Sequence, residues 1–251
     1  MSNVWLLKSG DDDGRYSDTL NRNGFSCHSI PALTFNFVNQ GPLQNAFERP
    51  LDHSGLIFTS PRAVEAVGKI YSKIKVEYHH EWSTKKIFVV GEATAAAVSK
   101  ELKMPTIGQE SGNAQQLAPI IIRETKAFDK PLLFPCGNIK RDELPRLLAN
   151  ADRDFRALTC YETSQHPSLK SKIQDLISKG LRPNCIVFFS PSGVSYVLPI
   201  LKSAGFDLTG MKIIAIGPAT NSALVQSSIP VSGVCNTPSP EGLLHILKSP
   251  L

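Results

Sequence analysis

The sequence contains an internal duplication, and this feature limits the possible folds more than any other. The segment LIFTSPRAV at Leu56–Val64 resembles IVFFSPSGV at Ile186–Val194. Further along each half, KIFVVGEAT at Lys86–Thr94 resembles KIIAIGPAT at Lys212–Thr220. Two weaker matches keep the same order, and they pair Trp5–Leu7 with Leu132–Phe134 and Asn113–Leu117 with Ser239–Leu243. Four matches in one order indicate two copies of one structural unit rather than chance similarity.

Each copy alternates short apolar segments with longer helix-like ones. The short segments are rich in β-branched and aromatic residues and end at turn residues: Leu56–Phe58, Ile87–Val90, Ile186–Phe189 and Ile213–Ile216. Continuous apolar strands that alternate with helices of roughly 10 to 15 residues are typical of buried parallel sheets. The sequence therefore predicts an α/β protein with two doubly wound parallel sheets, each of about five strand–helix units. A single large sheet would be unusual with so clear a repeat.

The junctions between strands and helices share their chemistry across the two copies. Ser-Pro begins at Ser60 and again at Ser190, where serine can cap a helix and proline can occupy its first position. Gly-x-x-Thr occurs at Gly91–Thr94 and at Gly217–Thr220. Such junctions leave backbone N–H groups at the carboxyl edge of a parallel sheet, where they can bind carboxylates or phosphates. Each junction taken singly is more simply explained as ordinary helix capping.

Composition and charge exclude several classes of protein. The 251 residues include 27 basic and 22 acidic side chains, a net charge of +5, without the block of Lys and Arg that indicates nucleic-acid binding. This excess suits an anionic small molecule, and a solvated surface explains it as well. No apolar run approaches the roughly 20 residues of a membrane span. The four-residue apolar run before Lys8 is too short for a secretion signal, so we expect a cytosolic protein.

Motifs for cofactors and covalent catalysis are absent from the sequence. It contains no G-x-G-x-x-G, no phosphate-binding loop motif and no G-x-S-x-G nucleophile motif. The five cysteines include no C-x-x-C pair, which argues against disulfides and zinc and favours a reducing compartment. His79-His80-Glu81 has no partner cluster that would complete a metal site. We therefore expect no organic cofactor, no metal and no covalent nucleophile.

Six segments spread over essentially the whole chain carry a resemblance to a known family. In order they are Gly55–Ala66, Val89–Thr94, Leu132–Asn138, Tyr161–Thr163, Phe188–Gly193 and Ala215–Thr220. Their set and order resemble uroporphyrinogen-III synthase of the eukaryotic type. The resemblance implies a hydro-lyase of haem biosynthesis that cyclises the linear tetrapyrrole hydroxymethylbilane to uroporphyrinogen III. Water is lost and ring D is inverted through a spiro intermediate. The resemblance also implies that the enzyme uses no cofactor and is a monomer.

The same resemblance implies a domain layout that differs from a simple division between the two copies. One flavodoxin-like domain would contain residues 1–33 and 166–251, and the other would contain residues 35–162. Two short strands, near residues 32–37 and 158–165, would join the domains as a hinge. A substrate cleft would lie between the two domains.

The resemblance also suggests which residues form the site. Tyr161 would face the substrate and assist the departure of hydroxide as a hydrogen-bond donor or acid; the alternative is that Tyr161 packs on the linker with its hydroxyl in water. The residues that would bind the substrate are Ser60, Arg62, Gly91, Thr94, Ser190, Ser192, Lys212, Gly217 and Thr220. Of these, Lys212 is as well explained as a solvated lysine at the start of a strand.

A second hypothesis belongs to a different class of function. A two-domain ligand-binding or sensor module derived from the same fold would have similar architecture and no catalysis. Because the lyase itself needs no nucleophile, the missing nucleophile does not separate the two hypotheses. Tyr161 combined with all four junctions favours the lyase, since a binding module has no evident need for the whole set.

Overall fold

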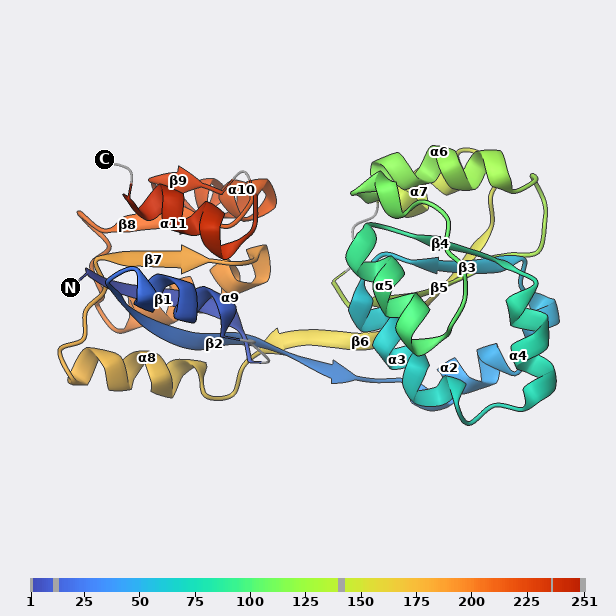
Figure 1. Cartoon of the computed structure of the whole chain (residues 1–251), viewed down its shortest axis with the longest axis horizontal. Coiled ribbons are helices and arrows are strands. Elements are labelled where there is room, and N and C mark those ends of the chain that lie inside the picture. The colour runs from blue at the N-terminus through green and yellow to red at the C-terminus, as the bar shows by residue number, and fades with distance from the viewer. Residues whose placement is uncertain (1, 11–13, 140–142, 236, 249–251) are drawn as a thin grey trace. The chain divides into compact units, whose positions relative to one another are not determined.

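The computed structural model describes residues 2–10, 14–139, 143–235 and 237–248, and it has an α/β fold of mostly parallel strands (Figure 1). The strands are β1 (Ser2–Ser9), β2 (Phe25–Phe37), β3 (Gly55–Phe58), β4 (Lys86–Val89), β5 (Leu132–Gly137), β6 (Phe155–Gln165), β7 (Cys185–Phe188), β8 (Lys212–Ala215) and β9 (Gly233–Val234). Neighbouring strands follow the order β4-β3-β5-β6-β2-β1-β7-β8-β9. The α/β class that the sequence predicts is therefore confirmed.

The chain divides into two compact units. Unit 1 consists of Met1–Thr34 and Ser164–Leu251, and unit 2 consists of Phe35–Thr163. Strands β2 and β6 each contribute residues to both units, because the boundaries fall inside them. The chain thus passes from one unit to the other along strands rather than through loops.

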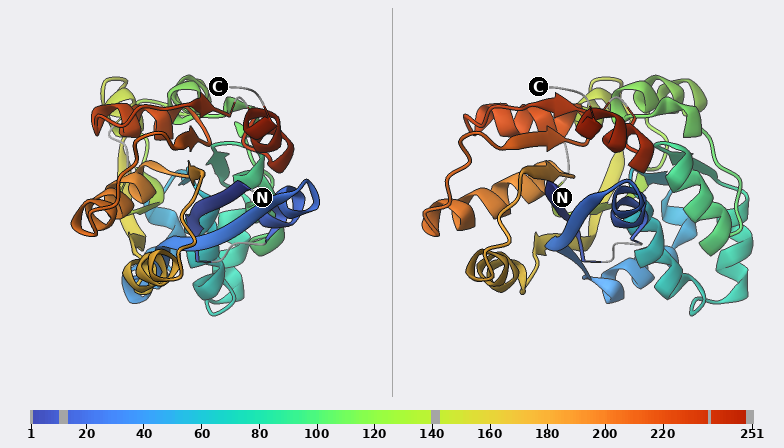
Figure 2. Two further views of the ribbon diagram at one scale, coloured as in Figure 1. Left: turned by 90° about the vertical axis from the view of Figure 1, so that its left-hand side faces the viewer. Right: turned by 60° about the vertical axis from the view of Figure 1, so that its left-hand side comes forward.

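Unit 1 has helices on both faces of a parallel sheet, as the end-on view of Figure 2 shows. Its helices are α1 (Arg15–Arg22), α8 (Leu169–Ser178), α9 (Pro191–Ser203), α10 (Pro218–Gln226) and α11 (Pro240–Lys248). Trp5 and Leu7 of β1 pack with α8, α9 and α10, whereas Val4 and Leu6 pack with α1 and α11. Because side chains alternate along a strand, a continuous apolar run buries both faces of the sheet.

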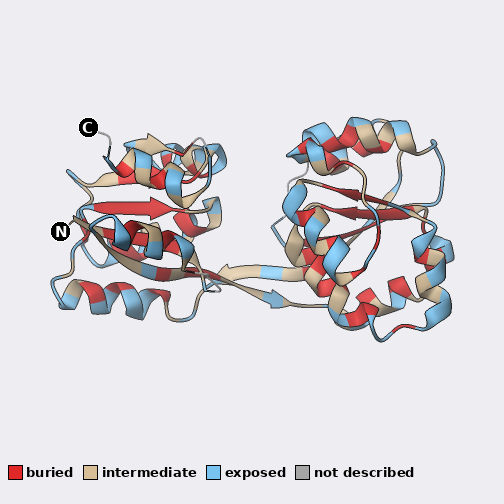
Figure 3. Ribbon diagram, viewed as in Figure 1, coloured by how far each residue is buried: buried red, intermediate tan, exposed pale blue. Residues whose placement is uncertain are grey.

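Unit 2 repeats this arrangement around strands β4, β3, β5 and β6. Its helices are α2 (Gln40–Phe47), η1 (Pro50–Asp52), α3 (Pro61–Tyr71), α4 (Val76–Ser83), α5 (Glu92–Glu101), η2 (Gln109–Ser111), α6 (Ala114–Glu124) and α7 (Glu143–Ala149). Leu56 and Phe58 of β3 face a core formed with α2 to α5, and Ile57 faces α6 and α7. The buried residues therefore concentrate in the central strands and on the helix faces turned toward them (Figure 3).

The two connecting strands are longer than the sequence indicates, and this corrects one expectation. We expected short hinge strands and two separate sheets, whereas β2 spans Phe25–Phe37 and β6 spans Phe155–Gln165. Each strand is long enough to pair within both units, so the hydrogen-bonded order runs through all nine strands. The strand repeat alone does not reveal this continuity. The apolar pattern identifies buried strands, whereas most residues of β2 and β6 are partly buried or exposed.

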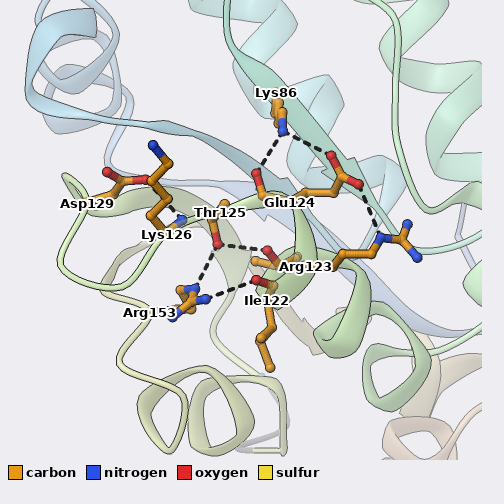
Figure 4. A network of polar contacts seen from close by, with 9 residues as sticks. Lys86, Ile122, Arg123, Glu124, Thr125, Lys126, Asp129 and Arg153 are labelled. Carbon is orange, nitrogen blue, oxygen red and sulfur yellow. Dashed lines mark hydrogen bonds and ion pairs between the residues drawn. The ribbon is translucent and has the colours of Figure 1, made fainter.

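Polar side chains hold the carboxyl end of α6 in unit 2 (Figure 4). Lys86 Nζ donates to the backbone carbonyl of Glu124 at 2.7 Å and to its carboxylate at 3.0 Å. The guanidinium of Arg153 donates to the Ile122 carbonyl at 3.0 Å and to the Thr125 hydroxyl at 3.1 Å. The last carbonyls of a helix lack partners within the helix and attract cationic donors. These contacts therefore connect α6 to the start of β4 and to the segment before β6.

Serine caps begin the two helices that follow the Ser-Pro junctions, as the sequence predicts. Ser60 Oγ accepts a hydrogen bond from the Arg62 N–H at 3.2 Å, and Ser190 Oγ accepts one from the Gly193 N–H at 3.0 Å. A proline occupies the first turn of each helix. None of the helices in the described ranges combines the length and apolar character that a membrane crossing requires.

The Ser190 cap can be tested by its contribution to stability. We expect Ser190→Ala to lower the free energy of unfolding by about 1 kcal/mol, and Ser190→Gly to lower it by only a few tenths. The matched control is Ser195→Ala, which loses a bond to the carbonyl of Ser192 on the exposed face of the same helix. Urea denaturation measures all three values. Equal losses for Ser190→Ala and Ser195→Ala would contradict the cap.

Candidate functional site

A pocket of about 320 Å³ lies at the carboxyl edge of the parallel strands of unit 2. Thr59 and Ser60 follow β3, Val90 follows β4, and Gly137 ends β5. The full lining consists of Thr59, Ser60, Val90, Gly112, Asn113, Ala114, Phe134, Cys136, Gly137, Ile139, Leu144 and Tyr161. We call it the carboxyl-edge pocket. This is the edge at which open α/β sheets bind their ligands.

A larger pocket of about 850 Å³ lies elsewhere in unit 2, between η1 and α4. Its lining includes the exposed apolar side chains of Leu51 and Val76. None of the residues that the sequence predicts for the site lines it. We therefore place the candidate site in the smaller pocket, where predicted residues from two strands meet.

Tyr161 forms one wall of the carboxyl-edge pocket and rests against a glycine. It lies on β6 directly opposite Gly137 of β5. A Cβ atom at position 137 would stand 2.6 Å from Tyr161 Cζ and 2.9 Å from its Oη, which is closer than real contacts allow. The ring therefore occupies space that only glycine leaves open. This contact fixes the position of the phenol at the pocket wall.

The Ser60 side chain lies close to the Tyr161 hydroxyl and lowers its pKa. Ser60 also connects the start of α3 to the pocket, because its oxygen accepts the Arg62 N–H. Burial raises the pKa of Tyr161 above its ordinary value, and Ser60 and the charge of Arg62 act against this increase. Since the ordinary value is near 10, the phenol is protonated at neutral pH and can donate a hydrogen bond or a proton.

An aromatic ring connects Arg62 to Tyr161. The guanidinium of Arg62 lies 4.6 Å from the centroid of the Phe35 ring, and Phe35 meets Tyr161 edge to face at a centroid distance of 6.2 Å. Arg62 also forms an ion pair with Glu65 at 2.8 Å. Stacking on Phe35 and pairing with Glu65 restrict the long Arg62 side chain. The side chains of Arg62 and Glu65 are 29% and 38% exposed, so a ligand can reach them.

Cys160, which precedes Tyr161 in the chain, does not supply a nucleophile. The Cys160 thiol is buried and donates to the Cys136 carbonyl at 3.5 Å. Burial raises the pKa of Cys160 to about 12. The thiolate, which is the reactive form, is therefore negligible at neutral pH.

The carboxyl edge of unit 1 has a cation held between two aromatic rings. Lys8 lies near the end of β1, and its ammonium stands 4.5 Å from the ring centroid of Tyr16 and 5.1 Å from that of Phe189. The two rings meet edge to face at 4.9 Å. Phe189 precedes the capping residue Ser190, so Lys8 belongs to the same edge as that junction.

The remaining predicted residues differ in their accessibility. Ser192 and Gly217 are half-buried and lie at the starts of α9 and α10. Gly91 begins α5 with φ 77°, a conformation that favours glycine. Thr94 and Thr220 each lie in the first turn of a helix and are only 2% and 3% exposed, so their hydroxyls belong to the interior.

The structure does not bring Lys212 together with the other predicted residues of unit 1. Lys212 is the first residue of β8, whereas Gly217 follows the carboxyl end of that strand. The two therefore lie at opposite edges of the parallel sheet. The pocket that Lys212 lines includes Ser2 and Cys185, which begin β1 and β7.

Sequence reasoning missed the close contact at Gly137 and the contribution of Phe35. Nothing in the sequence reveals that Gly137 lies opposite a tyrosine 24 positions later in the chain. The aromatic rings around Lys8 were missed for the same reason, since Tyr16 and Phe189 are far apart in the chain. The only sign of the Tyr161 contact in the sequence is that Gly137, a residue without a side chain, ends a strand.

The effect of Ser60 on Tyr161 can be tested by titration. Because Ser60 favours the phenolate, we expect Ser60→Ala to raise the pKa of Tyr161 further. The difference in phenolate absorbance between each protein and its Tyr161→Phe counterpart isolates this one tyrosine. Ser72→Ala, at an exposed position in the same unit, is the control and should leave the titration unchanged. A lower pKa in Ser60→Ala would contradict the proposed direction.

The glycine contact can be tested by adding a single methyl group. We expect Gly137→Ala to destabilise the fold by about 1–3 kcal/mol, because the new Cβ overpacks against the Tyr161 ring. Gly41→Ala is the matched control: it lies in α2 with no atom within 4 Å of the added Cβ, and should be neutral or stabilising. Thermal unfolding measures stability, and NMR of ring-labelled tyrosine reports displacement of Tyr161. An unmoved ring in Gly137→Ala would contradict the contact.

Comparisons with known proteins point to one family. The chain matches the family model described as "Uroporphyrinogen-III synthase HemD" over residues 14–245. It is 26% identical over 211 residues to the uroporphyrinogen-III synthase of Saccharomyces cerevisiae, an alignment that covers 77% of this chain and 74% of the yeast protein.

Solved structures with the same fold come from two bacteria. A mutant uroporphyrinogen III synthase from the extremely thermophilic bacterium Thermus thermophilus superposes with a TM-score of 0.67 at 14% identity, over 99% of this chain and 99% of that chain. The uroporphyrinogen-III synthetase of Helicobacter pylori gives a TM-score of 0.65 at 17% identity, over 98% of both chains. At these identities the superpositions establish similarity of fold alone.

Proposed function

We propose a mechanism from the premise that this chain belongs to the uroporphyrinogen-III synthase family, whose model matches residues 14–245. As a member it is a hydro-lyase of tetrapyrrole biosynthesis. The proposed substrate is hydroxymethylbilane, and the proposed product is uroporphyrinogen III with ring D inverted. The observation that carries the mechanism is the position of the Tyr161 phenol at the wall of the carboxyl-edge pocket, where it rests against Gly137 and which Ser60 lines as well.

Tyr161 is proposed to assist the departure of hydroxide from the substrate. Its O–H donates to the leaving oxygen, which departs as water once it has received a proton, and a cationic azafulvene remains. Attack by the substituted carbon of ring D on this cation forms a spiro intermediate, which opens and closes again with the ring inverted. The high pKa of the phenol keeps its proton available, and Ser60 stabilises the phenolate if the proton is transferred.

The junction residues are proposed to bind the eight carboxylates of the substrate. Backbone N–H groups at helix starts and serine hydroxyls are suitable donors, and Arg62 can form a bidentate pair. The proposed set contains Ser60, Arg62, Gly91, Thr94, Ser190, Ser192, Gly217 and Thr220; Lys212 is left out because it lies at the opposite edge of the sheet. Because Thr94 and Thr220 are buried, their contribution is expected through the backbone of the first helical turn. Lys8, held between two rings, is a further cation at the edge of unit 1.

The finer features of the domain arrangement belong to the same proposal. Two flavodoxin-like domains, residues 1–33 with 166–251 and residues 35–162, would be joined by the linker strands and would bind the substrate in the cleft between them. We further propose that the enzyme is a cytosolic monomer. The five free cysteines are consistent with a reducing compartment.

The reaction is tested by the isomer composition of the product. Purified protein receives freshly prepared hydroxymethylbilane, the products are oxidised, and the isomers I and III are separated. We expect isomer III to predominate, whereas spontaneous closure without the enzyme gives the uninverted isomer I. An isomer ratio equal to that of the spontaneous reaction would reject the catalytic function and favour a non-catalytic ligand-binding module.

The role of Tyr161 is tested by removing its hydroxyl. We expect Tyr161→Phe to lower turnover by about 10²- to 10⁴-fold, the usual effect of losing an acid, with little change in thermal stability. Tyr78→Phe is the matched control, because Tyr78 is half-buried in the same unit and lines the pocket beside α4 instead. Turnover of Tyr161→Phe equal to that of Tyr78→Phe would mean that another group assists the departure of hydroxide.

A further inference from the structure

A second polar pocket lies at the amino edge of the sheet of unit 2. It has a volume of about 250 Å³ and is lined by Pro42, Asn45, Ala46, Arg49, His53 and Arg156. His53 lies two residues before β3, and Arg156 is the second residue of β6. We call it the amino-edge pocket. Because the strands run parallel, this pocket and the carboxyl-edge pocket lie at opposite ends of the same strands.

His53 is a buried polar side chain without a hydrogen-bond partner. It is 2% exposed, and neither ring nitrogen has a partner among the described residues. The ring stacks on Trp82 at a centroid distance of 6.0 Å and an interplanar angle of 19°. A buried imidazole normally satisfies its nitrogens, because an unpaired polar atom costs about 1–3 kcal/mol. His53 lines the pocket, although both ring nitrogens are covered, so the ring lies beside the pocket and a direct hydrogen bond to a ligand requires the ring to turn.

Two arginines direct positive charge into the same pocket. Arg156 lies on the face of β6 that also carries Leu158 and Cys160, which pack against the core with α2. Arg49 follows α2, so the two guanidinium groups approach the pocket from different elements. Neither arginine forms an ion pair or a side-chain hydrogen bond with any residue in the described ranges. The pocket therefore contains two cations whose fork-shaped donors have no acceptor in the described part of the chain.

We propose that the amino-edge pocket binds a small oxyanion of the phosphate class, as the free ion or as the end group of a phosphate monoester. Two guanidinium groups present paired donors that match the oxygens of phosphate. The Asn45 amide at the pocket wall adds a neutral donor, and the imidazole of His53 lies beside the anion. The permanent charges of Arg49 and Arg156 exclude a metal cation. This site is separate from the one proposed for the tetrapyrrole.

The protonation of His53 provides a second measure of anion binding. Burial lowers the pKa of His53, and the nearby charges of Arg156 and Lys85 lower it further. The charge of Asp52 acts in the opposite direction, as does the nearby carbonyl of Pro131, whose geometry falls short of a hydrogen bond. The ring is therefore neutral at neutral pH in the free protein. A bound anion beside it favours the imidazolium and raises the pKa.

The test is calorimetric titration of the full chain with inorganic phosphate, at constant ionic strength maintained with chloride. We expect phosphate to bind and to raise the melting temperature as its concentration increases. Arg156→Gln and Arg49→Gln should each weaken phosphate binding by roughly tenfold or more, because each removes a charged hydrogen-bond donor. The matched control is Arg146→Gln, which removes the same charge from an exposed position of α7 in the same unit. Both arginines of the pocket are exposed, so these variants should fold normally.

Two further experiments identify which form of phosphate binds and where on the chain it binds. Glycerol phosphate that binds as tightly as inorganic phosphate identifies a site for the end group of a monoester, and binding of inorganic phosphate alone identifies a site for the free ion. In histidine NMR, phosphate should shift the ring signals of His53 and raise its pKa, while the other five of the six histidines are unaffected.

Three results would overturn the proposal. One is that phosphate stabilises the wild-type chain no more than chloride does. Another is that Arg146→Gln weakens phosphate binding as much as Arg156→Gln does, which would indicate a nonspecific charge effect. The third is that binding persists in Arg156→Gln and is lost in Ser60→Ala, which would assign the phosphate to the carboxyl-edge pocket.

Discussion

The parallel pairing of β5 with β6 is the contact on which the candidate site depends. The register shifts between Cys136 and Gly137, so that Gly137 lies opposite Tyr161 rather than opposite Cys160. This shift turns the tyrosine ring toward the pocket and sets it against the one residue type that leaves room for it. Cys160, the neighbouring residue, is buried in the core of α2 to α5, and the Tyr161 ring packs against the same core from the pocket wall.

The electrostatics of the site follow from that placement. Because the ring is partly buried, the pKa of its hydroxyl is raised and the proton is retained through neutral pH, while Ser60 acts to lower that pKa. Arg62 contributes a charge from the side, and its orientation depends on Phe35, which in turn contacts Tyr161. A neutral donor surrounded by groups that tolerate developing negative charge suits the departure of hydroxide from a substrate that becomes cationic. The strand register thus places the Tyr161 phenol, and the neighbouring side chains set the direction in which its pKa shifts.

The two edges of the sheet in unit 2 carry different kinds of residue, and only the carboxyl edge is marked by motifs in the sequence. The carboxyl edge is marked by repeated Ser-Pro and Gly-x-x-Thr junctions, which periodicity and capping rules make recognisable in the sequence alone. The amino edge has no motif, because Arg49, His53 and Arg156 come from three segments that share only a pocket. Motifs in the sequence therefore point to the carboxyl-edge pocket and not to the amino-edge pocket, since a pocket built from distant single residues leaves no local pattern.

By itself, the sequence determined the α/β class, the alternation of strands and helices, and the serine caps. Each of these depends on local periodicity or on contacts within a few residues, as in the cap that joins Ser190 to Gly193. The boundaries of the four apolar strands predicted in the repeats were displaced by only one residue, as at Lys86–Val89. Only the tertiary structure decided the lengths of β2 and β6, the pairing of Gly137 with Tyr161 and the opposite location of Lys212. These features depend on pairing partners far apart in the chain, and local propensity contains no information about which residues become neighbours.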